Sequence, residues 1–87
     1  MNIIGMLVHV NSIKIKQVEQ SLMKIGGIEV HAVTEKGQLI ITIEENDDQI
    51  LTEKIFQLHH LEGVLAAAIV YQYSETQGDI EDEAESA

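Results

Sequence analysis

The side chains of this 87-residue chain that are best suited to chemistry are four histidines and fifteen carboxylates, since it contains no cysteine. His59 and His60 are adjacent, whereas two metal ligands on one helix face need a spacing of four residues. We therefore expect both near the end of a helix, where they interact with its carbonyl groups, and we expect no metal site. His9 and His31 fall in separate segments, so each is expected to be a polar residue at an interface. The sequence has no nucleophile–base pair and no phosphate-binding glycine motif, which predicts neither a catalytic site nor a cofactor.

The charge of the chain is strongly negative, because 15 acidic residues stand against five basic ones and the formal net charge is −10. Nucleic acid is not expected as a partner, since phosphate neutralisation needs a basic surface and base stacking needs aromatic side chains. No apolar run approaches the roughly 20 residues that span a membrane, so membrane insertion is not expected either. The first ten residues lack the features of a signal peptide, and we expect a cytoplasmic protein. If charge selects a partner, that partner is basic.

The first half of the chain has the hydrophobic pattern of a strand followed by a helix. Residues 3–10 form a short apolar run rich in β-branched side chains, typical of a strand. Asn11 or Ser12 can cap the helix, and Gly26 with Gly27 can end it. The apolar positions of this helix recur every three or four residues, at Ile15, Val18, Leu22 and Ile25.

The second half repeats the strand–helix–strand pattern. Residues 28–33 and 38–45 alternate between apolar and polar side chains, and a turn that contains Gly37 joins them as a hairpin. An asparagine and two aspartates then cap a second helix, whose acids suit a positive helix N-terminus. Its apolar stripe is formed by Leu51, Ile55 and Leu58, with Ile50 and Leu61 beside it. Gly63 ends this helix, and the last strand continues to Tyr73.

The order β-α-β-β-α-β predicts an α+β fold of the ferredoxin-like, split βαβ type. Such a fold has a four-stranded antiparallel sheet with two helices on one face. We expect residues 1–74 to form this domain. Residues 75–87 are acidic and poor in aromatic side chains, so we expect a disordered tail there.

The alternation along the strands predicts which side chains the helices cover. The covered positions are expected to be Met6, Val8, Val10, Ile28, Val30, Leu39, Ile41, Ile43, Leu65, Ala67 and Ile69. The same alternation puts Ala32 on the face of Ile28 and Val30, and Val33 on the face of Glu29 and His31. The uncovered face, here called the open face, is expected to carry Gly5, Leu7, His9, Ile40, Thr42, Ala66, Ala68 and Val70, with Glu29, His31, Glu44 and Gln72 towards its edges.

The centre of the open face is expected to be small and apolar, whereas a solvated face should carry lysine, glutamate and threonine. Gly5, Ala66 and Ala68 would leave a shallow trough, and an apolar trough with a polar rim indicates a docking site. Two alternatives explain the same pattern, namely homodimerisation through the sheet and a terminal helix folded over it.

Several segments resemble the NapD family, and together they cover about residues 5–78. They are "GGIEV" from Gly26, "GQLIITIE" from Gly37, "LEGVLAAAIVYQYSE" from Leu61 and the pair Gln77–Gly78. The resemblance implies a ferredoxin-like cytoplasmic chaperone. Such a chaperone binds the twin-arginine signal peptide of the periplasmic nitrate reductase catalytic subunit, NapA. It holds back Tat export until cofactor loading and folding are complete.

The trough supplies the peptide-binding residues that this function would need. These are Gly5, Leu7, His9, Ile40, Thr42, Glu44, Ala66, Ala68 and Val70. Glu44, Glu29, Glu62 and the tail acids are candidate partners of the two arginines. The competing interpretation is a ligand-sensing or oligomerising ferredoxin-like regulatory module, with a pocket near Gly26 and Gly27. A weak homodimer is compatible with either interpretation.

Overall fold

The computed structural model describes residues 2–74. Its elements are β1 (Asn2–Val10), η1 (Ser12–Lys14), α1 (Ile15–Ile25), β2 (Ile28–Val33), β3 (Gln38–Glu44), α2 (Asp48–His59) and β4 (Val64–Ser74). This is the predicted order, with a short 3-10 helix added before α1. The expected acidic tail lies outside the described residues.

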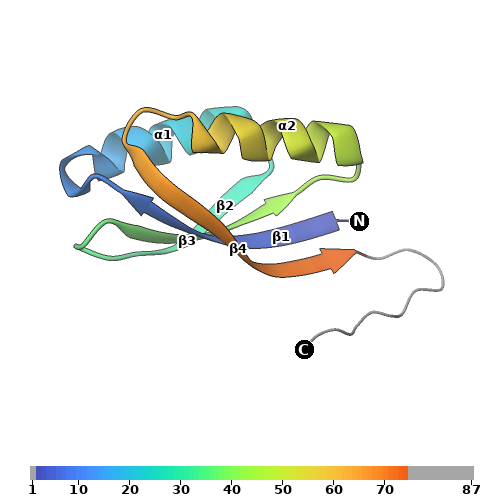
Figure 1. Cartoon of the computed structure of the whole chain (residues 1–87), viewed down its shortest axis with the longest axis horizontal. Coiled ribbons are helices and arrows are strands. Elements are labelled where there is room, and N and C mark those ends of the chain that lie inside the picture. The colour runs from blue at the N-terminus through green and yellow to red at the C-terminus, as the bar shows by residue number, and fades with distance from the viewer. Residues whose placement is uncertain (1, 75–87) are drawn as a thin grey trace.

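The four strands form one antiparallel sheet in the order β2-β3-β1-β4, and both helices lie on the same side of it (Figure 1). Helix α1 contacts β2 and helix α2 contacts β4. The start of β1 and the end of β4 are adjacent, on the right in Figure 1, and the β2–β3 hairpin lies at the opposite end. The predicted ferredoxin-like arrangement is confirmed, and one face of the sheet carries no helix.

Helices η1 and α2 begin at residues whose side-chain oxygens accept hydrogen bonds from the first backbone N–H groups of the helix. The Asn11 side chain accepts a hydrogen bond from the Ile13 N–H at 3.2 Å and so begins η1. The Asp47 side chain accepts from the Gln49 and Ile50 N–H groups at 2.9 and 3.1 Å. Each cap satisfies donors that would otherwise lack an acceptor.

The hairpin between β2 and β3 depends on Gly37, whose φ is +89°. A side chain there would collide with the Val10 carbonyl oxygen, because the hairpin tip packs directly against the end of β1. The Val10 N–H donates to the Gly37 carbonyl at 2.7 Å. Only glycine combines this conformation with so close a backbone approach.

The hydrophobic core lies between the helices and the covered face of the sheet. Its buried members are Ile4, Met6, Val8, Val10, Val18, Leu22, Ile28, Leu39, Ile41, Ile43, Leu51 and Leu58. The predicted helix stripes are confirmed, since Ile15, Ile25 and Ile55 pack against this cluster. Ile4 joins the core although the alternation had not been extended to it.

The structure departs from simple alternation at three β-bulges, each of which places one extra residue in a strand. The pairing skips Leu65 and Val70 in β4, opposite β1, and His31 in β2, opposite β3. Each extra residue leaves the ladder unpaired and shifts the residues beside it relative to the partner strand.

Two predictions for β4 are wrong because of these bulges. Leu65 is not covered by the helices but is 71% exposed, and Val64 takes the inward place opposite Val10. Gln72 pairs with buried Ile4 and therefore lies on the helix side, not on the open face. Ile69 is on the expected side, opposite Met6, but remains 49% exposed because it lies in the edge strand.

The bulge in β2 also reverses two expected positions. Ala32 pairs with Ile40 and lies on the open face, whereas Val33 pairs with buried Leu39 and turns to the helix side. The prediction for this pair was wrong, because the alternation restarts after His31.

Candidate functional site

The open face consists of side chains that alternate with the buried residues of the strands. On β1, for example, Gly5 and Leu7 alternate with the buried Ile4, Met6 and Val8. Four rows of paired residues run across the strands of this face, in order from the end where β1 begins and β4 ends to the hairpin end. The rows are Glu44–Ile3–Tyr73, Glu29–Thr42–Gly5–Tyr71, Ala32–Ile40–Leu7–Ala68 and Gln38–His9–Ala66.

The sequence-predicted site residues are brought together on three neighbouring strands. Leu7, Ile40 and Ala68 share the central row, with His9 and Ala66 in the next row towards the hairpin. Thr42 and Glu44 lie towards the other end. Val70 is the extra residue of a bulge, so it stands outside the paired rows, and it is 62% exposed.

The trough at Gly5 is not empty, because the Tyr71 side chain lies across from it. A Cβ built on Gly5 would be 3.1 Å from Tyr71 Cβ and 3.5 Å from its Cδ2. Gly5 is itself buried, so a bound helix cannot approach its backbone as the sequence suggested. The small-residue part of the face is limited to Ala66, Ala68 and Ala32, all of which are exposed.

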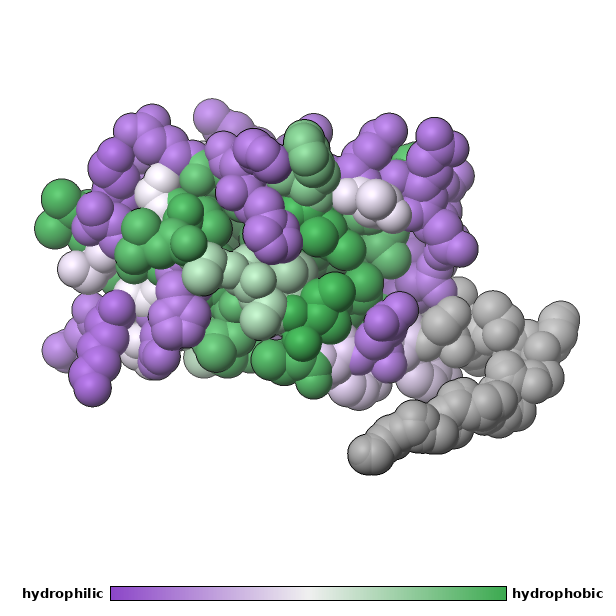
Figure 2. All heavy atoms as spheres, viewed as in Figure 1, coloured by the Kyte–Doolittle hydropathy of each residue, from purple (hydrophilic) through white to green (hydrophobic). Residues whose placement is uncertain are grey.

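Apolar side chains of β3 and β4 remain in contact with solvent. Ile40 and Tyr71 on the open face are 40% and 54% exposed, and Leu65 and Val70 in the bulges are more exposed still. Figure 2 shows apolar side chains gathered in the middle of the molecule over β4, below the polar surface of the helices. β4 is an edge strand without a charged residue between Val64 and Ser74. A surface of this kind indicates a docking site.

The electrostatics of the sheet come from Glu29 and Glu44, since the described strands contain no other acid and no lysine. Both side chains are exposed on the open face. Glu62, the third predicted arginine partner, lies at the opposite end, 2.7 Å from Lys14 Nζ. The hydrogen bond and charge of Lys14 lower the pKa of the Glu62 carboxyl below its ordinary value. Glu62 is thus already paired and away from the other two acids.

His59 and His60 contact carbonyl groups of their own helix, as the sequence indicated. His59 Nδ1–H donates to the Ile55 carbonyl at 2.9 Å, and His60 Nδ1–H donates to the Phe56 carbonyl at 2.8 Å. His9 and His31 lie on strands separated by β3, and His31 Nε2 is 2.8 Å from Thr42 Oγ1. Among residues 2–74, no three histidine or acidic side chains converge in a metal-binding arrangement.

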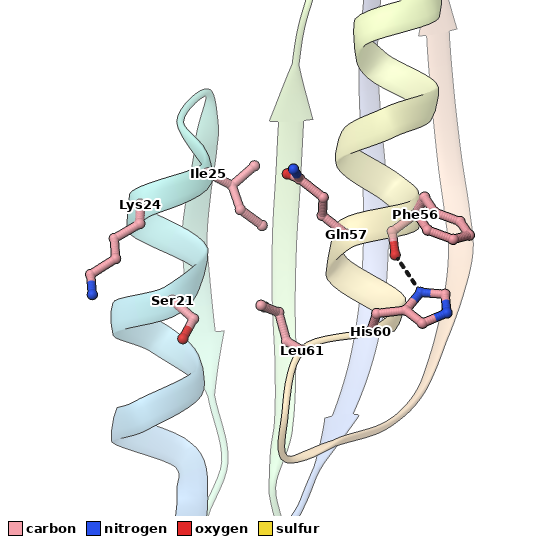
Figure 3. A pocket seen from close by; sticks show the side chains of 7 residues that line it. All are labelled: Ser21, Lys24, Ile25, Phe56, Gln57, His60 and Leu61. Carbon is pink, nitrogen blue, oxygen red and sulfur yellow. Dashed lines mark hydrogen bonds between the residues drawn. The ribbon is translucent and has the colours of Figure 1, made fainter.

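A groove of about 600 Å³ lies between the two helices, away from the open face. In Figure 3, Ile25 and Gln57 point into the gap from opposite sides, whereas Lys24 and Phe56 point away from it. The His60 ring stacks on Phe56 with 4.2 Å between ring centroids. The groove therefore has mixed polarity and no group of side chains poised for chemistry.

A ligand-sensing module would need a pocket near the turn at Gly26 and Gly27. The space around these two glycines is different. A Cβ on Gly27 would lie 2.7 Å from the Glu44 carbonyl oxygen and 2.9 Å from Lys54 Nζ. A Cβ on Gly26 would meet no atom within 4 Å. The turn is thus packed on one side and open surface on the other, which does not favour an enclosed ligand site.

Sequence reasoning missed four residues of the open face, namely Ile3, Ala32, Tyr71 and Tyr73. The two tyrosines and Ala32 were placed wrongly or not at all because the bulges reverse the alternation before them. Ile3 follows the regular alternation of β1, two residues before Gly5, and could have been found by extending that alternation towards the start of the strand.

No helix among the described residues is long and apolar enough to cross a membrane.

Comparisons with known proteins give one consistent result. The family model described as "NapD protein" matches residues 1–76. A protein named "Chaperone NapD" from Escherichia coli (strain K12) is 35% identical over 77 residues, covering 86% of this chain and 87% of the relative. The "Chaperone NapD" of Haemophilus influenzae is 26% identical over 77 residues, covering 87% of this chain and 83% of the relative. The solution structure of the "E. coli Tat proofreading chaperone protein NapD" has a TM-score of 0.74 and 29% identity, covering 98% of this chain and 90% of that one. These relatives are chaperones and not enzymes.

Proposed function

Because this chain belongs to the NapD family of chaperones, we propose that it binds the twin-arginine signal peptide of the nitrate reductase catalytic subunit, NapA. In this proposal it acts in the cytoplasm and delays Tat export until the client has received its cofactor and folded. The structural relative is a Tat proofreading chaperone, which supports this class of client.

The observation that carries the proposal is the open face itself, which combines exposed apolar side chains with two carboxylates. A twin-arginine signal peptide has the matching chemistry, with a basic front end followed by an apolar segment. Leu7, Ile40 and Ala68 offer an apolar track across three strands. An amphipathic helix laid on such a surface is a common mode of peptide recognition.

The charge of the whole chain supports the same partner. A formal net charge of −10 attracts a basic peptide and speeds its association at low salt. Exposed ion pairs each contribute only about 0–1 kcal/mol, so the apolar track must supply most of the affinity.

Ala68→Glu tests the proposal, because Ala68 is exposed at the centre of the open face. We expect the variant to fold normally by circular dichroism. Calorimetry should show a loss of about 2–5 kcal/mol in binding a twin-arginine peptide, because the complex would bury an unpaired charge.

Phe56→Glu is the matched control, since Phe56 is 65% exposed on α2 and lies away from the open face. It adds the same charge to the molecule and should leave the affinity nearly unchanged. If Ala68→Glu binds as well as this control, the open face is not the site. A weak homodimer through the same face stays a competing prediction, and light scattering over a range of concentrations would reveal it.

A further inference from the structure

The open face is electrically asymmetric along its length. Glu29 pairs with Thr42 across β2 and β3, and Glu44 lies two residues further along β3. Residues in this diagonal relation have Cα atoms about 7–8 Å apart. Both carboxylates of the described sheet are therefore close together, at the end where β1 begins and β4 ends.

Of the acids near this end of the sheet, Glu29 and Glu44 are the two whose carboxylates have no partner among the described residues. No hydrogen bond or ion pair joins either side chain to another residue of the described chain, 2–74. The other acids near this end have partners. Glu45 binds Lys54 at 2.9 Å, Asp47 caps α2, and the Asn2 side chain donates to Asp48 at 2.6 Å.

An aromatic side chain lies at the same end of the open face. Tyr71 lies in the same row as Glu29 but in β4, at the opposite edge of the sheet; it packs across Gly5 and is 54% exposed. Arginine stacks on aromatic faces and pairs with carboxylates in a planar fork, and lysine does neither as well. Two carboxylates without a partner among the described residues, together with an exposed tyrosine at the same end of the face, fit a pair of guanidinium groups.

The opposite end of the open face lacks this negative charge. Its last row, Gln38–His9–Ala66, contains no carboxylate. Lys36 and Glu35 lie side by side in the hairpin turn just beyond this row, and Lys14, which follows β1, is paired with Glu62. The charges at the hairpin end therefore balance, and this end attracts a basic segment less than the end with Glu29 and Glu44.

We infer that a bound signal peptide runs across the open face in one direction only. Its arginine pair lies at the end of the face that carries Glu29, Glu44 and Tyr71, with the carboxylates on β2 and β3 and the tyrosine on β4. Its apolar segment crosses Leu7 and Ile40, and the chain leaves past the hairpin end. This inference rests on the proposed function and adds the polarity of the complex, together with Tyr71 as an arginine contact.

The length of the face suits one continuous apolar segment. Six residue steps of β1 separate the row of Ile3 from the row of His9, a distance of about 20 Å. A helix with a rise of 1.5 Å per residue crosses such a distance in about 13 residues. A peptide of this size therefore places its two ends over opposite ends of the sheet.

The absence of cysteine makes the polarity directly measurable, because a single engineered thiol can carry a spin label at either end. Asn46→Cys marks the carboxylate end and Ser12→Cys marks the hairpin end, and both side chains are exposed. An isotope-labelled twin-arginine peptide is then added, and the broadening of its amide signals is compared. We expect the label at position 46 to broaden the arginine signals at least fivefold more than the label at position 12.

The end of the apolar segment should show the opposite preference. Equal broadening of both ends by each label, or the reversed pattern, would overturn the inferred direction. Calorimetry on the unlabelled protein separates this failure from a failure of the proposed function. If calorimetry detects no binding of the peptide, the proposed function is contradicted, and so is the inferred direction of the peptide.

Charge removal tests these residues themselves. The double variant Glu29→Gln, Glu44→Gln should bind the peptide about 3- to 30-fold more weakly, as expected for the loss of two exposed ion pairs. Glu19→Gln, Glu35→Gln removes the same charge elsewhere and should change the dissociation constant less than threefold. Tyr71→Leu keeps apolar area and should weaken an arginine peptide at least threefold more than its lysine counterpart. Equal losses in the two double variants, or no arginine preference at Tyr71, would contradict the assignment.

Discussion

The ion pair between Glu45 and Lys54 is the most enclosed charge contact of the described chain, with side chains 21% and 15% exposed. The hydrogen bond from Lys54 lowers the pKa of the Glu45 carboxyl below its ordinary value of 4.5. A lowered pKa in the folded state means that the unfolded state binds protons more readily. The stabilisation is therefore fully present above pH 4.5 and is lost as the pH falls through the folded-state pKa.

This pair yields a prediction for acid stability. Glu45→Gln should be less stable than the parent protein at pH 7, and the difference should shrink as the pH falls below 4.5. Urea denaturation of both proteins at pH 7 and pH 3 measures the change. Glu35→Gln, at an exposed turn position, is the control and should show no such pattern. A stability difference that stays constant from pH 7 to pH 3 would contradict the role assigned to this pair.

At the scale of elements, the hairpin between β2 and β3 sets the position of Ile40 and Thr42 on the open face. Its tip depends on Gly37, which combines a φ of +89° with backbone contact to Val10. Gly26 has a similar φ of +88°, but a Cβ there would meet no atom within 4 Å. A side chain added at Gly26 would strain only the backbone, whereas one added at Gly37 would also collide with Val10. Comparing the two substitutions therefore separates the free-energy cost of the strained backbone from that of the collision.

We expect Gly26→Ala to lower the free energy of unfolding by about 1–3 kcal/mol, the cost of a strained backbone. Gly37→Ala should cost clearly more, because the Val10 carbonyl must also move. Thermal or urea unfolding of the two variants side by side measures this difference. Similar losses in both would show that the hairpin tip can shift without disturbing β1.

The elements themselves could be predicted from the sequence, because helix periodicity, caps and turn glycines are local signals. Val18, Leu22 and Leu58, for example, are buried as their spacing indicated. The bulges are not local signals, since Leu65, Val70 and His31 are ordinary strand residues. They are fixed by the pairing of β4 with β1 and of β2 with β3, which only the folded sheet reveals.

The face on which each strand residue lies was therefore predicted correctly at the centre of the sheet and wrongly towards the end of β4. Leu7, Ile40 and Ala68 lie before or between bulges and keep their expected face. Beyond Val70 the order reverses, so Tyr71 occupies the face on which Gln72 had been expected. An aromatic residue thus stands where the sequence suggested an amide, and it fills the space that Gly5 had been expected to leave.

At the scale of the whole molecule, the two faces of the sheet have different tasks. The covered face holds the core, whereas the open face keeps Ile40, Tyr71 and Ala68 in contact with solvent. Burying apolar side chains stabilises a folded chain, so the side chains left exposed on the open face contribute less to stability than those of the core. A peptide that covers the open face would bury them and at the same time pair Glu29 and Glu44.

Methyl NMR with a twin-arginine peptide tests this central claim most directly, because methyl groups report on each face separately. We predict that the methyl signals of Leu7, Ile40, Ala66 and Ala68 shift when the peptide is added. The signals of Met23 and Ile50, which are 66% and 43% exposed on the helices, should stay in place. Shifts confined to the helix methyls, with the open-face methyls unchanged, would contradict the account.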